Sequence, residues 1–292
     1  MMWCAPDAAV LNALKTLKLR SRRALGFFAA LLALVTFGLP HTALPNRLND
    51  VFAALPLERR AEPVSKNLTE GVRSGRVMVA LAFGQSNAAN SGETRYSSRE
   101  NVYNVYRGKL YRARDPLLGA TGRGGSVWTR LGDRLIAAGH YDAVVIIPLA
   151  VGNTAIASWT VGGELHAGVL KAVREVQAQG LSVTHLLWHQ GESDPNTPAD
   201  AYQSMFKAML ASIRSEGVDA PIYVSVATRC HQQGPNETLR RAQQSLVDPA
   251  QNIYAGPDTD TLGRRYRYDG CHFSTEGLER FAELWLSALE PE

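Results

Sequence analysis

Short apolar segments recur along the chain beyond residue 75. Four of them are rich in Val, Ile and Leu and are apolar throughout, without alternation: residues 76–84, 141–152, 184–191 and 221–228. Strands that are buried on both faces have this pattern, and such strands form parallel sheets. The pattern therefore predicts four parallel strands in the interior of an α/β domain.

Segments with helical periodicity separate the predicted strands. They cover residues 126–139, 164–180 and 198–217, and the last two end on Gly180 and Gly217, as helices often do. Alternating strands and helices predict right-handed crossovers and a three-layer α/β/α sandwich with a central parallel sheet. In this architecture a ligand site lies at the carboxyl ends of the strands.

The residues before this domain have a different character. Residues 24–39 carry no charge and follow a basic segment, residues 1–23, whereas prolines and charges mix in residues 40–75. This order predicts a cytoplasmic segment, a signal anchor or signal peptide, and a linker before a domain at residues 76–292. Cleavage and retention are both open, but His41 stands where a cleavage site needs a small residue. We therefore expect an exported domain, periplasmic or extracellular, anchored in the membrane by residues 24–39.

Composition excludes some classes of partner. A chain of 292 residues with 45% hydrophobic content can bury a stable core. The net charge of +4 arises before residue 24, where five Lys or Arg residues stand against Asp7, and the remainder balances. A nucleic-acid face needs basic residues clustered in the folded part, so we expect no nucleic-acid partner. The chain also lacks Cys-x-x-Cys spacing, so we expect no metal site.

Small and polar residues follow three of the predicted strands, at 84–87, 152–154 and 189–194. Ser86 in the first group is a candidate nucleophile, although a helix N-cap explains this serine equally well from the local sequence. A nucleophilic serine needs a base and a carboxylate that orients the base. Asp269 and His272, three residues apart before the last helix, supply both. On one turn the carboxylate can accept from one imidazole nitrogen while the other nitrogen faces the serine.

Four motifs in this order carry a family resemblance: "GQSN" at 84–87, "GNTAIASW" at 152–159, "WHQGESD" at 188–194 and "DGCH" at 269–272. Together they resemble the sialate O-acetylesterase and acetylxylan esterase branch of the SGNH (GDSL-like) hydrolases. The resemblance covers about residues 76–292. It implies a flavodoxin-like α/β/α hydrolase that removes acetyl groups from carbohydrate and needs neither metal nor other cofactor.

The resemblance also implies residue roles. Ser86 would be the nucleophile, His272 the general base and acid, and Asp269 the carboxylate that orients His272. The oxyanion hole would use three donors: the backbone N–H of Ser86, the N–H of Gly152 or Asn153, and the side-chain amide of Gln190. The branch often has Gly-Gly-Thr where this chain has Gly-Asn-Thr, so the choice between the Gly152 and Asn153 amides stays open.

Two other functions use the same residues. An O-acetyltransferase would keep the triad and replace water with a sugar hydroxyl. A non-catalytic glycan-binding module on a hydrolase scaffold belongs to another class, and the intact set of Ser86, Asp269 and His272 argues against it. Glu192 and Asp194 could also be the paired carboxylates of a glycosidase, but a loop-supporting role for Glu192 is simpler.

Two further features point to substrate contacts. Trp159, which follows the 152–154 group, is a better candidate than Trp188 for stacking on a sugar ring. The glycine-rich residues 119–126 lack the Gly-Lys-Ser/Thr ending of a phosphate loop, and we expect a mobile substrate loop there.

The cysteines allow one pairing in an oxidising compartment. Cys4 lies on the cytoplasmic side of the predicted anchor, which leaves Cys230 and Cys271. Cys230 follows a predicted strand and Cys271 lies between Asp269 and His272, so both should reach the same edge of the sheet. We predict a Cys230–Cys271 disulfide, the alternative being two unpaired buried cysteines.

Overall fold

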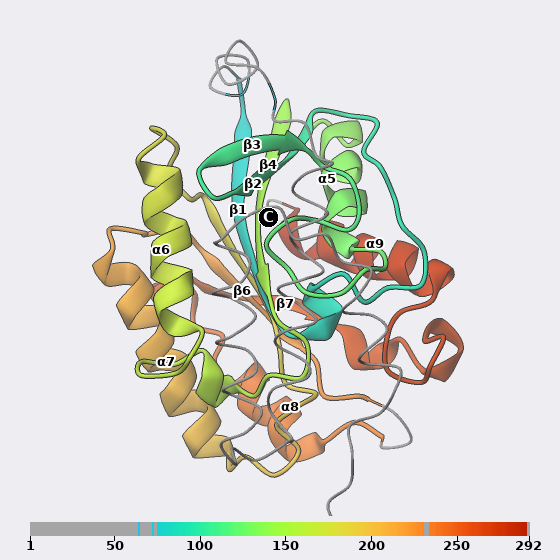
Figure 1. Ribbon diagram of the computed structural model, residues 1–292. Helices are drawn as coiled ribbons and strands as arrows, with labels where there is room; N and C mark the ends of the chain where they lie inside the picture. Colours follow the sequence, from blue (N-terminus) through green and yellow to red (C-terminus); the bar gives the residue numbers. More distant parts are fainter. Residues whose placement is uncertain (1–63, 65–71, 73–74, 231–233, 291–292) are drawn as a thin grey trace, which may run out of the picture. The chain divides into compact units, whose positions relative to one another are not determined.

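Seven strands form one sheet through the middle of the computed structural model (Figure 1). The structure describes residues 64, 72, 75–230 and 234–290. The spatial order of the strands is β3 (Lys109–Arg112), β2 (Val102–Tyr106), β4 (Ala143–Ala150), β1 (Val77–Gly84), β5 (His185–His189), β6 (Ile222–Val226) and β7 (Ile253–Asp258). Neighbouring strands are parallel except β2 and β3, which pair antiparallel at one edge. The predicted parallel sheet is thus confirmed, with an antiparallel strand added.

The four predicted strands correspond to β1, β4, β5 and β6, whereas β2, β3 and β7 were not predicted. β2 and β3 form a hairpin whose turn residues, Arg107 and Gly108, both have positive φ, at 49° and 69°. Such a turn matches the twist of the two strands it joins. β7 contains Gly256 and Pro257, residues that argue against a strand, and it is tolerated because it lies at the sheet edge.

Helices cover both faces of the sheet (Figure 1). On one face, α6 (His166–Gln177) and α7 (Ala199–Ser215) pack against alternate β1 residues, among them Leu81 and Phe83. On the other face, α5 (Val127–Ala137) and α9 (Thr275–Leu289) pack against Ala80 and Ala82. The short helix α8 (Glu237–Gln244) contacts α7 and β6. This arrangement confirms the predicted three-layer α/β/α sandwich.

The strand order determines where a site can form. β4 and β2 lie on one side of β1, whereas β5, β6 and β7 lie on the other, so the chain changes direction across β1. Ligand sites of open α/β sheets lie at such a point, beyond the carboxyl ends of the strands. Gly84, the last residue of β1, pairs with Ala150 of β4 and His189 of β5. The residues that follow these three strands therefore meet at one edge.

The predicted N-terminal segments, residues 1–23 and 24–39, lie outside the described residues, as does most of the predicted linker. Three linker residues are described: Val64, Val72 and Gly75. The Val64 N–H donates to the Leu110 carbonyl at 2.7 Å, and Val72 is buried in the core beside α6 and α7. Within the described ranges, no helix combines the length and apolarity that a membrane crossing requires.

Candidate active site

The turn after β1 presents Ser86 at the edge of the sheet. Gly84 has a φ of 134°, and a Cβ there would lie 2.0 Å from the His189 carbonyl oxygen, so this close approach requires glycine. Ser86 is the first residue of a short 3-10 turn, η1 (Ser86–Ala88), and is 8% exposed. Gln85 occupies the N-cap position and its side chain makes no capping hydrogen bond. Ser86 is therefore not the helix cap that the local sequence allowed.

The loop after β4 lies against this turn. A Cβ on Gly152 would lie 3.6 Å from Ser86 Cβ, which places the two residues side by side. The Gly152 N–H donates to Thr121 Oγ1 at 2.8 Å, so this amide already has an acceptor. Asn153 is exposed, with a φ of 59°. The structure therefore brings Ser86, Gly152 and Asn153 together.

Asp269 and His272 form an ion pair on one short turn. His272 Nδ1 lies 2.6 Å from Asp269 Oδ2, and the N–H groups of Cys271 and His272 donate to Asp269 Oδ1 at 2.9 and 2.7 Å. Burial raises the pKa of Asp269, but the hydrogen bonds from His272 and Cys271 outweigh burial and hold this pKa below its ordinary value. An ionised Asp269 keeps a proton on Nδ1, which leaves Nε2 of His272 as the basic nitrogen.

Gln190 is fully buried, and its amide nitrogen faces protein acceptors. Nε2 donates to the Thr154 carbonyl at 3.0 Å and, through a short hydrogen bond, to Asp194 Oδ2. Asp194 also accepts from the Ile156 N–H at 3.0 Å. Gln190 and Asp194 thus connect the loops after β4 and β5, and direct donation by Gln190 to an oxyanion requires one of these bonds to open.

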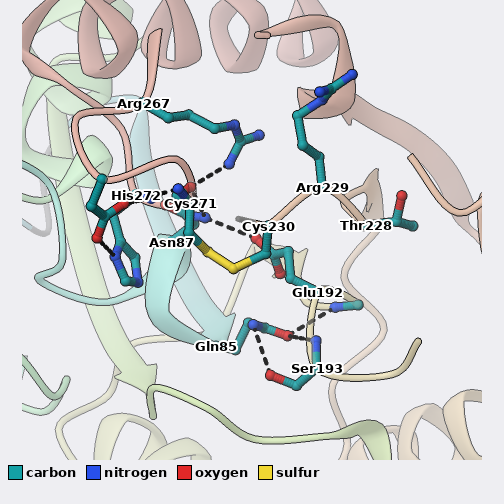
Figure 2. The surroundings of a disulfide bond; sticks show 12 residues. Gln85, Asn87, Glu192, Ser193, Thr228, Arg229, Cys230, Arg267, Cys271 and His272 are labelled. Atoms are coloured by element: carbon teal, nitrogen blue, oxygen red, sulfur yellow. Dashed lines mark hydrogen bonds and ion pairs between the residues drawn. A yellow bond between two sulfur atoms is a disulfide. The ribbon is translucent and has the colours of Figure 1, made fainter. Parts of the chain in front are cut away.

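The two residues that flank Ser86 tie it to neighbouring loops, and both were missed as functional residues in the sequence. Gln85 Oε1 accepts from the N–H groups of Gly191 and Ser193, each at 3.1 Å. Asn87 Nδ2 donates to Glu192 Oε1 at 2.9 Å and to the Cys271 carbonyl at 3.2 Å (Figure 2). The only signal for these roles in the sequence was their place within "GQSN".

Glu192 supports the loops from the interior, as expected in preference to a glycosidase role. Its side chain is 2% exposed, and burial raises its pKa to about 7, against the opposing effect of the hydrogen bond from Asn87. Asp194 is 1% exposed and is hydrogen-bonded inward. Neither carboxyl group is placed to flank a substrate bond, as the pair in a glycosidase must be.

Arg267 fixes the loop that carries Asp269 and His272. This buried side chain donates from Nη1 to the Cys271 carbonyl at 2.5 Å, from Nη2 to the Thr259 carbonyl at 2.9 Å and from Nε to the Leu262 carbonyl at 3.0 Å. Nothing in the sequence pattern distinguished Arg267 from a surface arginine.

The predicted Cys230–Cys271 disulfide is present (Figure 2). Cys230 follows β6, and Cys271 is 2% exposed within the turn between Asp269 and His272. The bond therefore attaches the turn that carries Asp269 and His272 to the segment that follows β6.

The predicted sugar contact at Trp159 is wrong. Trp159 is completely buried, with its ring against Phe83 and Trp188, and its Nε1 donates to Thr154 Oγ1 at 3.0 Å. A side chain in this position cannot reach substrate. Trp188 is equally buried.

The glycine-rich residues 119–126 lie beside Asp269 and His272. Residues 122–124 line a pocket of about 430 Å³ together with residues 90–93, Tyr268, Asp269 and His272. The N–H groups of Gly124 and Gly125 donate to the carbonyls of Asn90 and Gly92, at 2.7 and 2.8 Å. The structure thus places part of this loop beside Asp269 and His272, and hydrogen bonds hold its backbone against residues 90–92; its contact with substrate stays a prediction.

Comparisons with known proteins agree with this fold and these motifs. A family model described as "Carbohydrate esterase, sialic acid-specific acetylesterase" matches residues 76–289. A curated relative, a probable carbohydrate esterase of Arabidopsis thaliana, is 29% identical over 143 residues. That alignment covers 46% of this chain and 52% of the relative, so the chain spans about half the length of the curated relative it matches.

Solved structures share the fold at low identity. An Arabidopsis thaliana protein solved by X-ray crystallography has a TM-score of 0.61 and 19% identity, covering 74% of this chain and 98% of that chain. The structure of NanS has a TM-score of 0.50 and 16% identity, covering 73% of this chain and 96% of that one. These likenesses show a common architecture with the α/β/α sandwich described above.

Proposed function

The chain belongs to the carbohydrate esterase family of sialic acid-specific acetylesterases, and from that premise we propose that it is a serine O-acetylesterase acting on a carbohydrate through an acyl-enzyme. The observation that carries this proposal is the Asp269–His272 ion pair, at 2.6 Å, on a turn that Asn87 ties to the nucleophile turn. Nucleophilic catalysis needs a serine that is free to react and a base whose tautomer is fixed. Ser86 is not used as a helix cap, and the turn that carries His272 is tied to the turn that carries Ser86.

In the proposed reaction Ser86 Oγ attacks the acetyl carbonyl carbon while His272 Nε2 takes the hydroxyl proton. The tetrahedral intermediate then expels the sugar oxygen, which receives that proton from His272. Water next attacks the acyl-enzyme, giving its proton to His272, and acetate leaves as the proton returns to Ser86 Oγ. Asp269 stays ionised throughout and stabilises the imidazolium.

We propose that the oxyanion is held by backbone amides at the ends of β1 and β4. The Ser86 N–H, at the first position of a 3-10 turn, has no acceptor within that turn. Because the Gly152 N–H donates to Thr121, the Asn153 N–H is the favoured second donor. Each pre-aimed donor of this kind is worth about 3 to 4 kcal/mol to the transition state.

The proposal gives Gln190 two possible contributions. Its amide holds the Thr154 carbonyl, and so restrains the loop that carries the Asn153 N–H one residue earlier. If the bond to Thr154 or Asp194 opens when substrate binds, the same amide becomes a third oxyanion donor. In both cases Gln190 acts on the transition state more than on ground-state binding.

We also propose that the domain is exported, as the N-terminal sequence predicts. The Cys230–Cys271 disulfide supports this proposal, because disulfides persist in oxidising compartments. Fractionation of cells that produce the full chain tests it: recovery of the chain in the cytosol with both thiols reduced would contradict export.

Acetate release by the full chain tests the enzymatic proposal, with a panel of O-acetylated sialic acids, acetylated xylan and a small aryl acetate. Ser86→Ala should reduce turnover by about a thousandfold or more and leave folding intact. The matched control is Ser215→Ala, at an exposed serine at the end of α7. Activity of Ser86→Ala within about tenfold of the parent would remove Ser86 from its role. Product analysis with an acceptor glycan present separates hydrolysis from acetyl transfer.

A further inference from the structure

Tyr268 is an exposed aromatic residue beside the proposed catalytic base. Its side chain is 52% exposed, and Val161 is the other large hydrophobic residue exposed to this degree in the part of the chain that the structure describes. Single exposed hydrophobic residues are ordinary on protein surfaces, so exposure alone indicates nothing. The position and the contacts of Tyr268 are what distinguish it.

Tyr268 is held at both ends. Its N–H donates to the His272 carbonyl at 3.0 Å, and its hydroxyl donates to the Ser91 carbonyl at 3.3 Å. The ring centroid lies 6.3 Å from that of the His272 imidazole, with an angle of 31° between the planes. The ring therefore stands next to the imidazole in a tilted orientation, and it lines the same pocket of about 430 Å³.

Three glycines form part of the pocket wall, together with the polar residues Asn90, Ser91, Glu93 and Arg123. Gly92, Gly122 and Gly124 line it, and a Cβ on Gly124 would lie 2.1 Å from the Gly92 carbonyl oxygen. The close approach of the two backbones thus requires glycine at position 124. The Glu93 carboxylate, at the rim, accepts from the Thr275 N–H at 2.8 Å and caps α9.

An aromatic face with peptide groups beside it suits one ligand shape. A sugar ring has an apolar C–H face that can lie on an aromatic ring, and an equatorial edge of hydroxyls that can bond to peptide groups. A sugar ring seated on Tyr268 would lie beside the His272 imidazole, and an ester on its edge would stand in the same pocket as that imidazole. The buried Trp159 and Trp188 provide no such surface.

We propose that Tyr268 is the platform on which the sugar ring of the acetylated substrate stacks. The proposal rests on the esterase function proposed above. It makes Tyr268 a specificity-determining residue, which favours ring-bearing esters over esters that have no ring.

The test compares Tyr268→Ala, Tyr268→Leu and Tyr268→Phe in the full chain. The substrates are an O-acetylated monosaccharide that the parent hydrolyses and ethyl acetate, which has no ring. Loss of the aromatic face should raise KM for the sugar ester about three- to tenfold, with a smaller change in kcat, and Tyr268→Phe should retain most of the parent's KM. Val161→Ala, at the other exposed hydrophobic residue, is the matched control.

The ratio of kcat/KM for the two esters decides the proposal. A ratio that falls in Tyr268→Ala and Tyr268→Leu supports stacking, whereas an unchanged ratio in folded variants overturns it. A binding measurement separates this outcome from failure of the esterase function. In a Ser86→Ala background, nuclear magnetic resonance titration with the acetylated monosaccharide should show weaker binding when Tyr268 is also changed to Leu. Equal affinity with and without Tyr268 overturns the platform even if the chain proves to have no esterase activity.

Discussion

Removal of the Cys230–Cys271 disulfide should impair catalysis before it unfolds the domain. Cys271 lies between Asp269 and His272, and its N–H is one of the donors to the Asp269 carboxylate. Reduction, or the double substitution Cys230→Ser and Cys271→Ser, releases this turn from the end of β6. We expect loss of the acid–base geometry while the sheet and its helices persist.

The expected loss of stability follows from the length of chain that the bond closes. The two cysteines are 41 positions apart. On the chain-entropy estimate, closing a loop of this length stabilises the folded state by about 4 kcal/mol. Domains of this kind are commonly stable by about 5 to 15 kcal/mol, so the reduced domain should remain folded at 25 °C. In the reduced protein, the hydrogen bonds from Asn87 and Arg267 to the Cys271 carbonyl should still hold the turn in part. Each contributes about 1 kcal/mol.

Two measurements on the same reduced sample test this reasoning. Acetate release should fall by about tenfold or more, since a displacement of about 1 Å in a catalytic group can cost a hundredfold. Far-ultraviolet circular dichroism should be unchanged, and the urea midpoint should decrease. Cys4→Ser, which leaves the pair intact, is the control.

Two results would refute the reasoning. Fully reduced protein that keeps its turnover would show that the turn does not depend on the bond. Mass spectrometry of native, active protein, alkylated without reductant, would refute the disulfide itself if both Cys230 and Cys271 were modified.

The remaining predictions concern three buried or charged groups of the site. Asp269→Asn should lower kcat by about four orders of magnitude while leaving KM close to the parent value, because the imidazole of His272 loses its fixed tautomer; a change confined to KM would contradict this. Gln190→Ala should lower kcat by about a hundredfold with a smaller effect on KM, and steady-state kinetics showing a change in KM alone would make Gln190 a binding residue. Burial raises the pKa of Glu192 from 4.5 to about 7, so the folded state binds more protons than the unfolded state between these values and stability falls as pH rises through this window. Glu192→Gln should flatten that slope in urea denaturation between pH 4 and pH 8, and an unaltered slope would show that Glu192 does not titrate there.

The sequence predicted the interior of the sheet better than its edges. Interior strands such as β1 and β4 are buried on both faces, so their residues are apolar throughout and are easily recognised. β2 carries two tyrosines and an asparagine, which weaken the apolar pattern, and β3 exposes Lys109 and Arg112 because it lies at the sheet edge and meets solvent. β7 is interrupted by glycine and proline, which its place at the sheet edge accommodates.

The position of the site was predictable, whereas the direction of individual side chains was not. Strand ends gather by topology, so Ser86, Gly152 and Gln190 could be placed at one edge from the sequence. Trp159 follows the same loop, but the turn at residues 156–158 directs it into the core, where the Thr154 hydroxyl accepts from its indole N–H. The side-chain amide of Gln190 is directed inward by its hydrogen bond to Asp194, four positions later. The periodicity of the sequence does not reveal which acceptor such an amide binds.

In the proposed mechanism, the coupling between Ser86 and His272 depends on Cys271, the residue that precedes His272. Ser86 and His272 belong to segments far apart in the sequence, and their relative position must be set by contacts between those segments. Three contacts converge on Cys271: the Asn87 amide and the Arg267 guanidinium donate to its carbonyl, and its sulfur joins Cys230. The three partners come from the nucleophile turn, from the start of the acid–base turn and from the end of β6. These three contacts restrain Cys271, and we expect them to set the position of the neighbouring His272 relative to Ser86.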